Sequence, residues 1–382
     1  MLPYGRQDIQ EEDVQAVVEV LRHQYLTQGQ QVPALEKALA EYTGTPWVTL
    51  VNSATSALHL GCLALGVEQG DRVWTSPLSF VASANCARYC GAEVDFVDID
   101  PSTLNLSLPA LANKLAWAAS LGRLPKLLIV VHFAGLSADM AEIKALCERY
   151  QVRLMEDASH ALGGRYQGMP VGALQHADLC VFSFHPVKMI TTGEGGAILC
   201  RDPELHQRIQ RLRSHGIDKD SKLQEQEGGW YYQQQELGFN YRMTDLQAAL
   251  GLSQLSRLDG YVQQRQALAE RYDQQLQGLP LQLPPRVDYA ESSWHLYVVQ
   301  LQDPMQRRPL YDFLQVQGVA VQVHYIPIHW QPYYQRLGFA RGDFPAVEDY
   351  YQRTLTLPLF PTLTNVQQDR VIALLHSFLS PD

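Results

Sequence analysis

The sequence contains no long hydrophobic run. Its longest apolar stretches, such as residues 127–131, are far shorter than the roughly 20 residues needed to cross a bilayer. Residues 1–6 are followed by an acidic segment at 10–13, so the beginning also lacks the apolar centre of a secretory signal. We therefore expect a soluble protein of the cytoplasm that does not bind membranes.

Cysteine is scarce and irregularly placed. The six cysteines include no Cys-x-x-Cys pair and no spacing typical of metal ligands. Cys86 and Cys90 stand one helical turn apart in an apolar segment, which favours buried thiols over a disulfide or a metal site. We expect reduced thiols, as in the cytosol, and no bound metal.

Positive charge is also not in excess. The chain has 30 Lys and Arg against 40 Asp and Glu, a net charge of −10 at pH 7, which argues against nucleic acid as a partner. Its 46% hydrophobic and 18% charged residues are ordinary for a globular enzyme. A chain of 382 residues exceeds the usual single core, so we expect two domains.

The first part of the chain alternates between two patterns. After helical segments at 10–23 and 33–42, short apolar runs alternate with helical stretches. The expected strands are 47–51, 72–75, 94–97, 127–131, 152–155, 179–184 and 197–199. The expected helices between them are 57–65, 80–89, 107–118 and 140–150. This alternation predicts an α/β fold, with a mostly parallel sheet sandwiched by helices and ligands at the carboxyl ends of the strands.

The later part of the chain reads differently. Residues 218–237 are polar and irregular and are expected to form a loop, whereas 244–277 predict one or two long helices. Beyond residue 280, the expected elements are strands at 295–301 and 319–323 and helices at 305–317 and 366–379. We predict a large α/β domain at 1–250, including the N-terminal helices, and a small α+β domain at 251–382.

One lysine stands where an amine can react. Lys188 lies between Pro186 and a Gly-rich turn, just past a buried strand, where its amine loses a proton at low cost and can form a Schiff base with an aldehyde. Asp157, 31 positions earlier, ends an apolar run and is the group needed to keep a pyridine nitrogen protonated. Together they suggest pyridoxal phosphate, although Lys188 taken alone is better explained as one surface lysine among many.

Weaker signals accompany this pair. Thr55 and Ser56 stand at a junction of strand and helix, which is either an anion seat or an ordinary helix cap, and Ser183 precedes Lys188 by five residues. Phe80 is a candidate to stack on a pyridine ring, with core packing as the alternative. His160 reads as a cofactor contact or a structural histidine. Asn240, followed by Tyr241 and Arg242, reads alone as a plain turn.

The order of these features along the chain resembles that of fold type I pyridoxal-phosphate enzymes. The segments Pro3-Tyr4-Gly5-Arg6, Leu26-Thr27-Gln28-Gly29 and Phe239-Asn240-Tyr241-Arg242 resemble the DegT/DnrJ/EryC1/StrS sugar-nucleotide aminotransferases, and the resemblance covers essentially the whole chain. The departure near the lysine is Met189, where proline is commoner.

Four motifs narrow the resemblance: residues 52–59, 157–163, 213–216 and 322–327. They are similar to family members that aminate C4 of UDP-2-acetamido-2,6-dideoxy-β-L-arabino-hexos-4-ulose in pseudaminic acid biosynthesis. The resemblance implies L-glutamate as the amino donor, with 2-oxoglutarate released. A different keto nucleotide sugar is the nearest alternative. A related sugar dehydratase carries histidine in place of the lysine, and a non-catalytic scaffold would be expected to lose Lys188 or Asp157.

The resemblance also implies roles for individual residues. Lys188 would hold pyridoxal 5'-phosphate, Asp157 would pair with its ring nitrogen and Phe80 would stack on the ring. The other implied cofactor contacts are Thr55, Ser56, His160, Ser183 and, reaching the neighbouring subunit of a homodimer with shared active sites, Asn240. The implied contacts of the UDP-sugar are Tyr4, Gln24, Tyr25, Leu26, Thr27, His324 and Tyr325.

Overall fold

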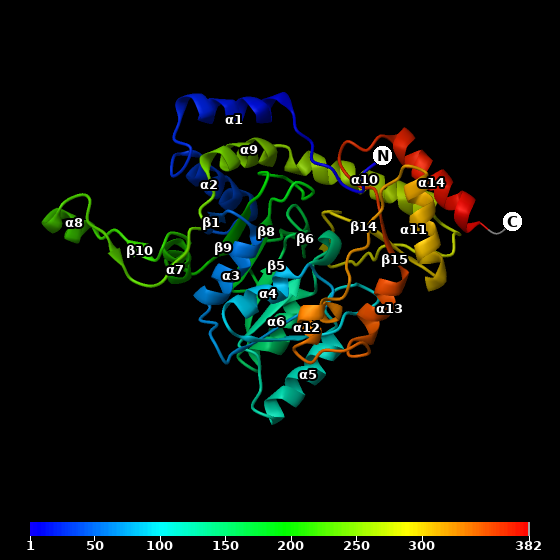
Figure 1. The fold of residues 1–382 in the computed structure, drawn as a ribbon, viewed down its shortest axis with the longest axis horizontal. Coiled ribbons are helices and arrows are strands. Elements are labelled where there is room, and N and C mark those ends of the chain that lie inside the picture. Colours follow the sequence, from blue (N-terminus) through cyan, green and yellow to red (C-terminus); the bar gives the residue numbers. More distant parts are fainter. Residues whose placement is uncertain (381–382) are drawn as a thin grey trace.

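The computed structural model describes residues 1–380 and is built on a seven-stranded sheet (Figure 1). Its strands, in spatial order, are β1 (Trp47–Val51), β9 (Gly196–Cys200), β8 (Leu179–Ser183), β5 (Arg153–Asp157), β4 (Leu127–Val131), β2 (Arg72–Thr75) and β3 (Glu93–Phe96). Only β9 runs antiparallel to its neighbours in this sheet. All seven apolar runs predicted as strands lie here, so the predicted α/β fold is confirmed.

Hydrophobic clusters cover both faces of this sheet. In β4, Leu127 and Ile129 belong to one cluster, whereas Leu128 and Val130 belong to another. Alternate side chains of a strand point to opposite faces, so every residue of this strand is buried. The helices of this part of the chain are α3 (Ala54–Ala64), α4 (Ala82–Tyr89), α5 (Leu108–Ser120), α6 (Met140–Glu148) and α7 (Pro203–Arg213). The sheet therefore forms the middle layer of a sandwich.

The N-terminal helices α1 (Glu11–His23) and α2 (Gln31–Thr43) pack on α9 (Asp245–Leu255). The predicted helical segment at 244–277 is two helices, α9 and α10 (Leu258–Gln275). Buried Asp13 accepts hydrogen bonds from Arg257 and from Gln254. This ion pair joins α1 to the junction between α9 and α10.

The C-terminal part has a sheet and a core of its own. The sheet contains β12 (Leu281–Gln282), β14 (Tyr297–Leu301) and β15 (Thr354–Leu357). Residues of α11 (Arg307–Val316) and α14 (Asn365–Leu379) belong to its hydrophobic core, and α13 (Pro345–Arg353) contacts β14. The short helix α12 (Pro332–Gln335) packs instead on the core of the large sheet through Tyr334. The strand predicted at 319–323 is wrong, because this segment makes only isolated bridges to Leu2 and Thr356. The predicted boundary between residues 250 and 251 falls inside α9, and the division into two domains stays a prediction.

Residues 217–238 project from the body of the molecule as an arm (Figure 1). The arm contains β10 (Ile217–Asp218), α8 (Ser221–Glu227) and β11 (Gln233–Gln234), so the predicted irregular loop is wrong. Asp220 accepts hydrogen bonds from two backbone N–H groups of α8, and this cap explains why so polar a segment becomes helical. Its Trp230 side chain is 80% exposed and Leu237 is 81% exposed.

A second small sheet joins the two parts of the chain. It consists of β13 (Ala290–Glu291), β6 (Arg165–Tyr166) and β7 (Met169–Pro170). Within residues 1–380, no helix is both long enough and apolar enough to span a bilayer.

Gly196 gives a first prediction. A Cβ atom at this position would lie 2.6 Å from the backbone nitrogen of Ala54, where α3 begins. Gly196→Ala should therefore lower the free energy of unfolding by about 1–3 kcal/mol, because backbone atoms must move. Urea unfolding would measure this. Gly260→Ala is the matched control, since its Cβ would meet no atom within 4 Å and alanine favours a helix. Equal stability of the two variants would contradict the argument.

Candidate active site

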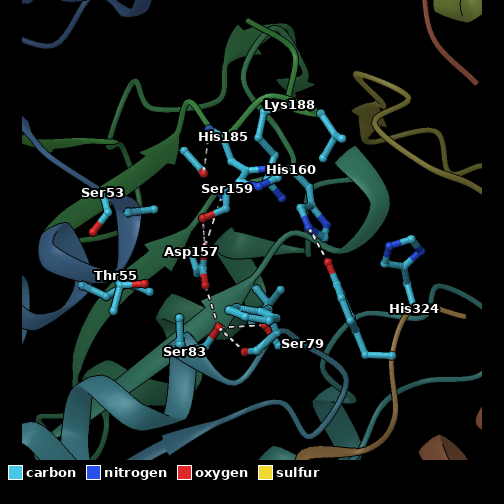
Figure 2. A pocket seen from close by; sticks show the side chains of 18 of the residues that line it. Ser53, Thr55, Ser79, Ser83, Asp157, Ser159, His160, His185, Lys188 and His324 are labelled. Atoms are coloured by element: carbon cyan, nitrogen blue, oxygen red, sulfur yellow. Dashed lines mark hydrogen bonds between the residues drawn. The ribbon is translucent and has the colours of Figure 1, made fainter. Parts of the chain in front are cut away.

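A cavity of about 470 Å³ lies at the carboxyl ends of the central strands (Figure 2). Val131 ends β4, Asp157 ends β5 and Ser183 ends β8, and all three line the cavity. The other lining residues are Tyr4, Ser53, Ala54, Thr55, Leu58, Ser79, Phe80, Ala82, Ser83, Ser159, His160, His185, Val187, Lys188, Glu194, His324 and Tyr325. The position is that expected for a ligand site in a parallel sheet.

Hydrogen bonds hold the Asp157 carboxylate in one orientation. The Ser83 hydroxyl donates to one oxygen at 2.6 Å, and the Ser159 hydroxyl donates to the other at 2.6 Å. The Ser159 backbone N–H adds a third bond at 3.2 Å, and Ser79 contacts Ser83 at 2.7 Å. The carboxylate is 5% exposed, and these donors offset the cost of its burial (Figure 2).

Lys188 enters the same cavity from the turn after β8. Burial lowers the pKa of its amine to about 8, and the nearby negative charge of Asp157 partly opposes this shift. Its Nζ lies 3.4 Å from Nε2 of His295. The unprotonated amine is therefore the minor form at neutral pH and reaches one half near pH 8, where an ordinary lysine remains charged.

His160 is held as a neutral imidazole. Burial, Lys188 and His324 all lower its pKa. Its Nδ1 accepts the Ala134 backbone N–H at 3.3 Å, so the proton is assigned to Nε2, which donates to the Tyr325 hydroxyl oxygen at 3.1 Å. The hydroxyl proton of Tyr325 then remains available for a ligand oxygen.

The start of α3, which the sequence predicts as an anion seat, borders the cavity through Ser53 and Thr55 rather than through Thr55 and Ser56. Ser53 caps the helix by accepting the Ser56 N–H at 3.1 Å, and both Ser53 and Thr55 line the cavity. Ser56 does not line it, because its hydroxyl donates to Asn52 at 2.7 Å. Ser183 at the end of β8 lines the same cavity. Figure 2 shows Ser53 and Thr55 near each other at the start of α3.

The predicted residues fall into two groups. Phe80, Tyr4, His324 and Tyr325 line the cavity, and Phe80 is 60% exposed. The residues predicted to bind the sugar from segment 24–27, and Asn240, are exposed and do not line it. Their roles stay predictions.

Sequence reasoning missed several polar groups around the cavity. Ser79 and Ser83 are one helical turn apart, and Ser159 is two residues from Asp157, so spacing offered a signal for these three. The sequence pattern predicts His295 only as the first residue of a strand and gives no sign of a role in the site. Tertiary folding alone brings it to Lys188.

The residues present fit pyridoxal phosphate. A half-buried amine, a fixed carboxylate, an exposed aromatic ring and hydroxyl groups at a helix N-terminus all face one cavity. Among residues 1–380, no group of three or more His, Cys, Asp or Glu is arranged to hold a metal ion.

Comparison with known proteins agrees with this chemistry. The chain is 38% identical over 378 residues to the spore coat polysaccharide biosynthesis protein SpsC of Bacillus subtilis, covering 97% of this chain and 95% of that protein. It is also 40% identical over 362 residues to the UDP-4-amino-4,6-dideoxy-N-acetyl-β-L-altrosamine transaminase of Campylobacter jejuni. This match covers 94% of this chain and 92% of that protein.

Two solved structures have the same fold. The sugar aminotransferase Spr1654 of Streptococcus pneumoniae, in its PMP form, superposes with a TM-score of 0.92 at 30% identity, covering 99% of both chains. Helicobacter pylori PseC, an aminotransferase involved in the biosynthesis of pseudoaminic acid, superposes with a TM-score of 0.91 at 32% identity. This match also covers 99% of both chains. The model of the DegT/DnrJ/EryC1/StrS aminotransferase family matches residues 7–376. The chain belongs to this family and is a pyridoxal-phosphate-dependent sugar aminotransferase.

Proposed function

We propose that this aminotransferase moves an amino group from L-glutamate to C4 of UDP-2-acetamido-2,6-dideoxy-β-L-arabino-hexos-4-ulose, a step of pseudaminic acid biosynthesis. The observation that carries the amino-transfer chemistry is the meeting of Lys188 and Asp157 in one cavity. Support for the sugar comes from the 40% identity to the Campylobacter jejuni transaminase.

Asp157 and Lys188 have different roles in the proposed reaction. Pyridoxal phosphate, when bound, supplies an electron sink for the bond being broken. Asp157 keeps a negative charge where the protonated ring nitrogen belongs. Lys188 would be the base of the 1,3 proton shift. Its tethered amine, with its lowered pKa, would take a proton from one carbon and return it to the carbon two atoms away. Glutamate and the keto sugar use this cavity in turn, so we expect ping-pong kinetics.

The same proposal includes a homodimer with shared sites. Exposed segment 24–27 and Asn240 do not reach the cavity of their own chain, although the family resemblance assigns them to a site. The arm at 217–238 presents Trp230 to solvent on a segment that projects from the body. A second copy of the chain satisfies both observations. We also propose a cytoplasmic location, where the six free thiols stay reduced.

The nearest alternative is another keto nucleotide sugar, on a different carrier or with the keto group at C3. Lys188 argues against the related dehydratases, which carry histidine at this position. The choice among keto sugars is a matter for direct measurement.

Asp157→Asn should lower kcat for the glutamate half-reaction roughly a hundredfold or more, because a neutral amide no longer holds the proton on the ring nitrogen. Single-turnover formation of 2-oxoglutarate measures this. Ser159→Ala is the control: it removes a hydrogen bond and keeps the charge, so a loss of about tenfold or less is expected. An Asp157→Asn enzyme within a few-fold of the wild type would contradict the assigned role.

A panel of keto nucleotide sugars tests the substrate. Purified enzyme is incubated with glutamate and each of several 4-keto and 3-keto sugars on UDP, GDP and dTDP, and product masses are followed. The UDP-linked 4-keto N-acetylated sugar should give the highest kcat/KM, and Lys188→Ala should give no product with any sugar. Preferential turnover of a 3-keto dTDP sugar would show the substrate assignment to be wrong.

Mixed dimers test the shared site. Lys188→Ala and Asn240→Ala chains are unfolded together, refolded and assayed at limiting pyridoxal phosphate. If Asn240 serves the neighbouring site, random pairing restores about a quarter of all sites, because one site in each mixed dimer has neither defect. Each variant refolded alone is the control. Mixtures no more active than the average of the two controls would rule out sharing through Asn240.

A further inference from the structure

His295 lies within hydrogen-bonding distance of the reactive amine. Its Nε2 lies 3.4 Å from Nζ of Lys188, and the side chain is buried, with 4% of its surface exposed. Its other ring nitrogen, Nδ1, has no hydrogen-bond partner. A buried polar atom without a partner is costly, so this histidine is poorly explained as a packing residue.

The backbone around His295 is held firmly. Buried Arg265 on α10 donates hydrogen bonds to the carbonyl oxygens of Trp294 at 3.1 Å and His295 at 3.2 Å. The Ser293 hydroxyl donates to the His160 carbonyl oxygen at 2.7 Å, and the Leu296 N–H donates to the Ala134 carbonyl oxygen at 3.2 Å. The imidazole is therefore fixed relative to both Lys188 and His160.

The charges around His295 keep its ring neutral. Its ring lies 4.5 Å from that of His160, measured between centroids. Burial lowers its pKa well below the usual value, and the nearby cationic or ionisable groups lower it further. These groups are Lys188 from the turn after β8, His160 after β5, Arg265 from α10 and His324 before β15. Asp157 and His185 complete the ionisable groups that interact with Lys188.

We propose that His295 is a positioning residue that holds the Lys188 amine through its neutral Nε2. A charged lysine can only donate, so Nε2 accepts and Nδ1 carries the proton. The contact steadies the amine beside the reacting atoms whenever the lysine is not bonded to the cofactor. It also favours the protonated form of the lysine and so limits the loss of basicity that burial causes.

The test measures the lysine itself, in enzyme stripped of cofactor. Lys188 is labelled with dinitrofluorobenzene over a range of pH, and the peptide that carries it is quantified by mass spectrometry. Exposed Lys37, whose side chain is 78% exposed, is the internal reference. His295→Phe keeps the ring volume and removes the acceptor, so the labelling midpoint of Lys188 should fall by about one pH unit.

Two further variants keep the test decisive. His295→Gln places an amide oxygen near the position of Nε2 and should keep the midpoint within a few tenths of a unit of the wild type. His295→Asn is one bond shorter, ends near the position of Nδ1 and should behave like the Phe variant. If His295→Phe does not fold, the difference in labelling midpoint between His295→Gln and His295→Asn tests the proposal. Equal midpoints in the wild type and a folded His295→Phe, or equal midpoints for Gln and Asn, would overturn the proposal.

Kinetics of the cofactor-loaded enzyme give a second measurement. A weaker and less well placed base should lower kcat for the glutamate half-reaction about tenfold in His295→Phe, with KM unchanged, and His295→Gln should recover most of the loss. A rise in KM with unchanged kcat would also overturn the proposal. These measurements use no sugar, so their outcome is independent of the sugar assignment, and the labelling experiment is also independent of the amino donor.

Discussion

The rest of the site depends on a balance between desolvation and charge at Lys188. Burial lowers the pKa of the amine and Asp157 raises it, leaving a value of about 8. A fully solvated lysine would remain protonated at neutral pH and could not serve as a base. The carboxylate that restores part of the basicity is itself buried, and it needs the donors from Ser83 and Ser159.

The strand order of the sheet brings these groups together. Asp157 is in register with Val181 on the neighbouring β8, and β8 ends two residues later at Ser183. Ser183 is in register with Gly196, and Gly196 with Val51 at the end of β1. Two rows of backbone pairing, two residues apart along β8, therefore bring the carboxylate, the Ser183 hydroxyl and the turn that begins α3 to the same end of the sheet. The bare backbone of Gly196 lets that turn approach the sheet.

Much of this could be predicted from the sequence. The strands of the large sheet are short apolar runs buried on both faces, so their pattern needs no tertiary information, and Asp157 and Lys188 follow such runs directly. Two segments outside this sheet are harder to predict from their sequence pattern. Residues 319–323 are as apolar as a strand but pair only through single bridges, and 217–238 gain order from the Asp220 cap and a two-stranded ribbon.

Some contacts of the site likewise depend on geometry that local sequence patterns do not contain. Ser56 and Ser53 are chemically equivalent in the sequence, and only the helix geometry shows that Ser56 turns toward Asn52 while Ser53 lines the cavity. His295 is far from Lys188 in the chain, and its contact depends on the docking of the C-terminal part against β5 and β8. Local patterns carry no information about such a contact, because it is fixed by packing between distant segments.

The charge of the proposed substrates bears on the proposed homodimer. Glutamate carries two carboxylates and a UDP-sugar carries a diphosphate, and both require cationic groups or many N–H donors. Among the described residues, those lining the cavity include Lys188 and three histidines but no arginine. Two of these histidines, His160 and His324, have pKa values lowered by burial and by Lys188, so they are neutral near pH 7. The lining of one cavity therefore suits the cofactor and the reacting carbon better than the anionic ends of the proposed substrates, and the proposed homodimer would supply further donors there.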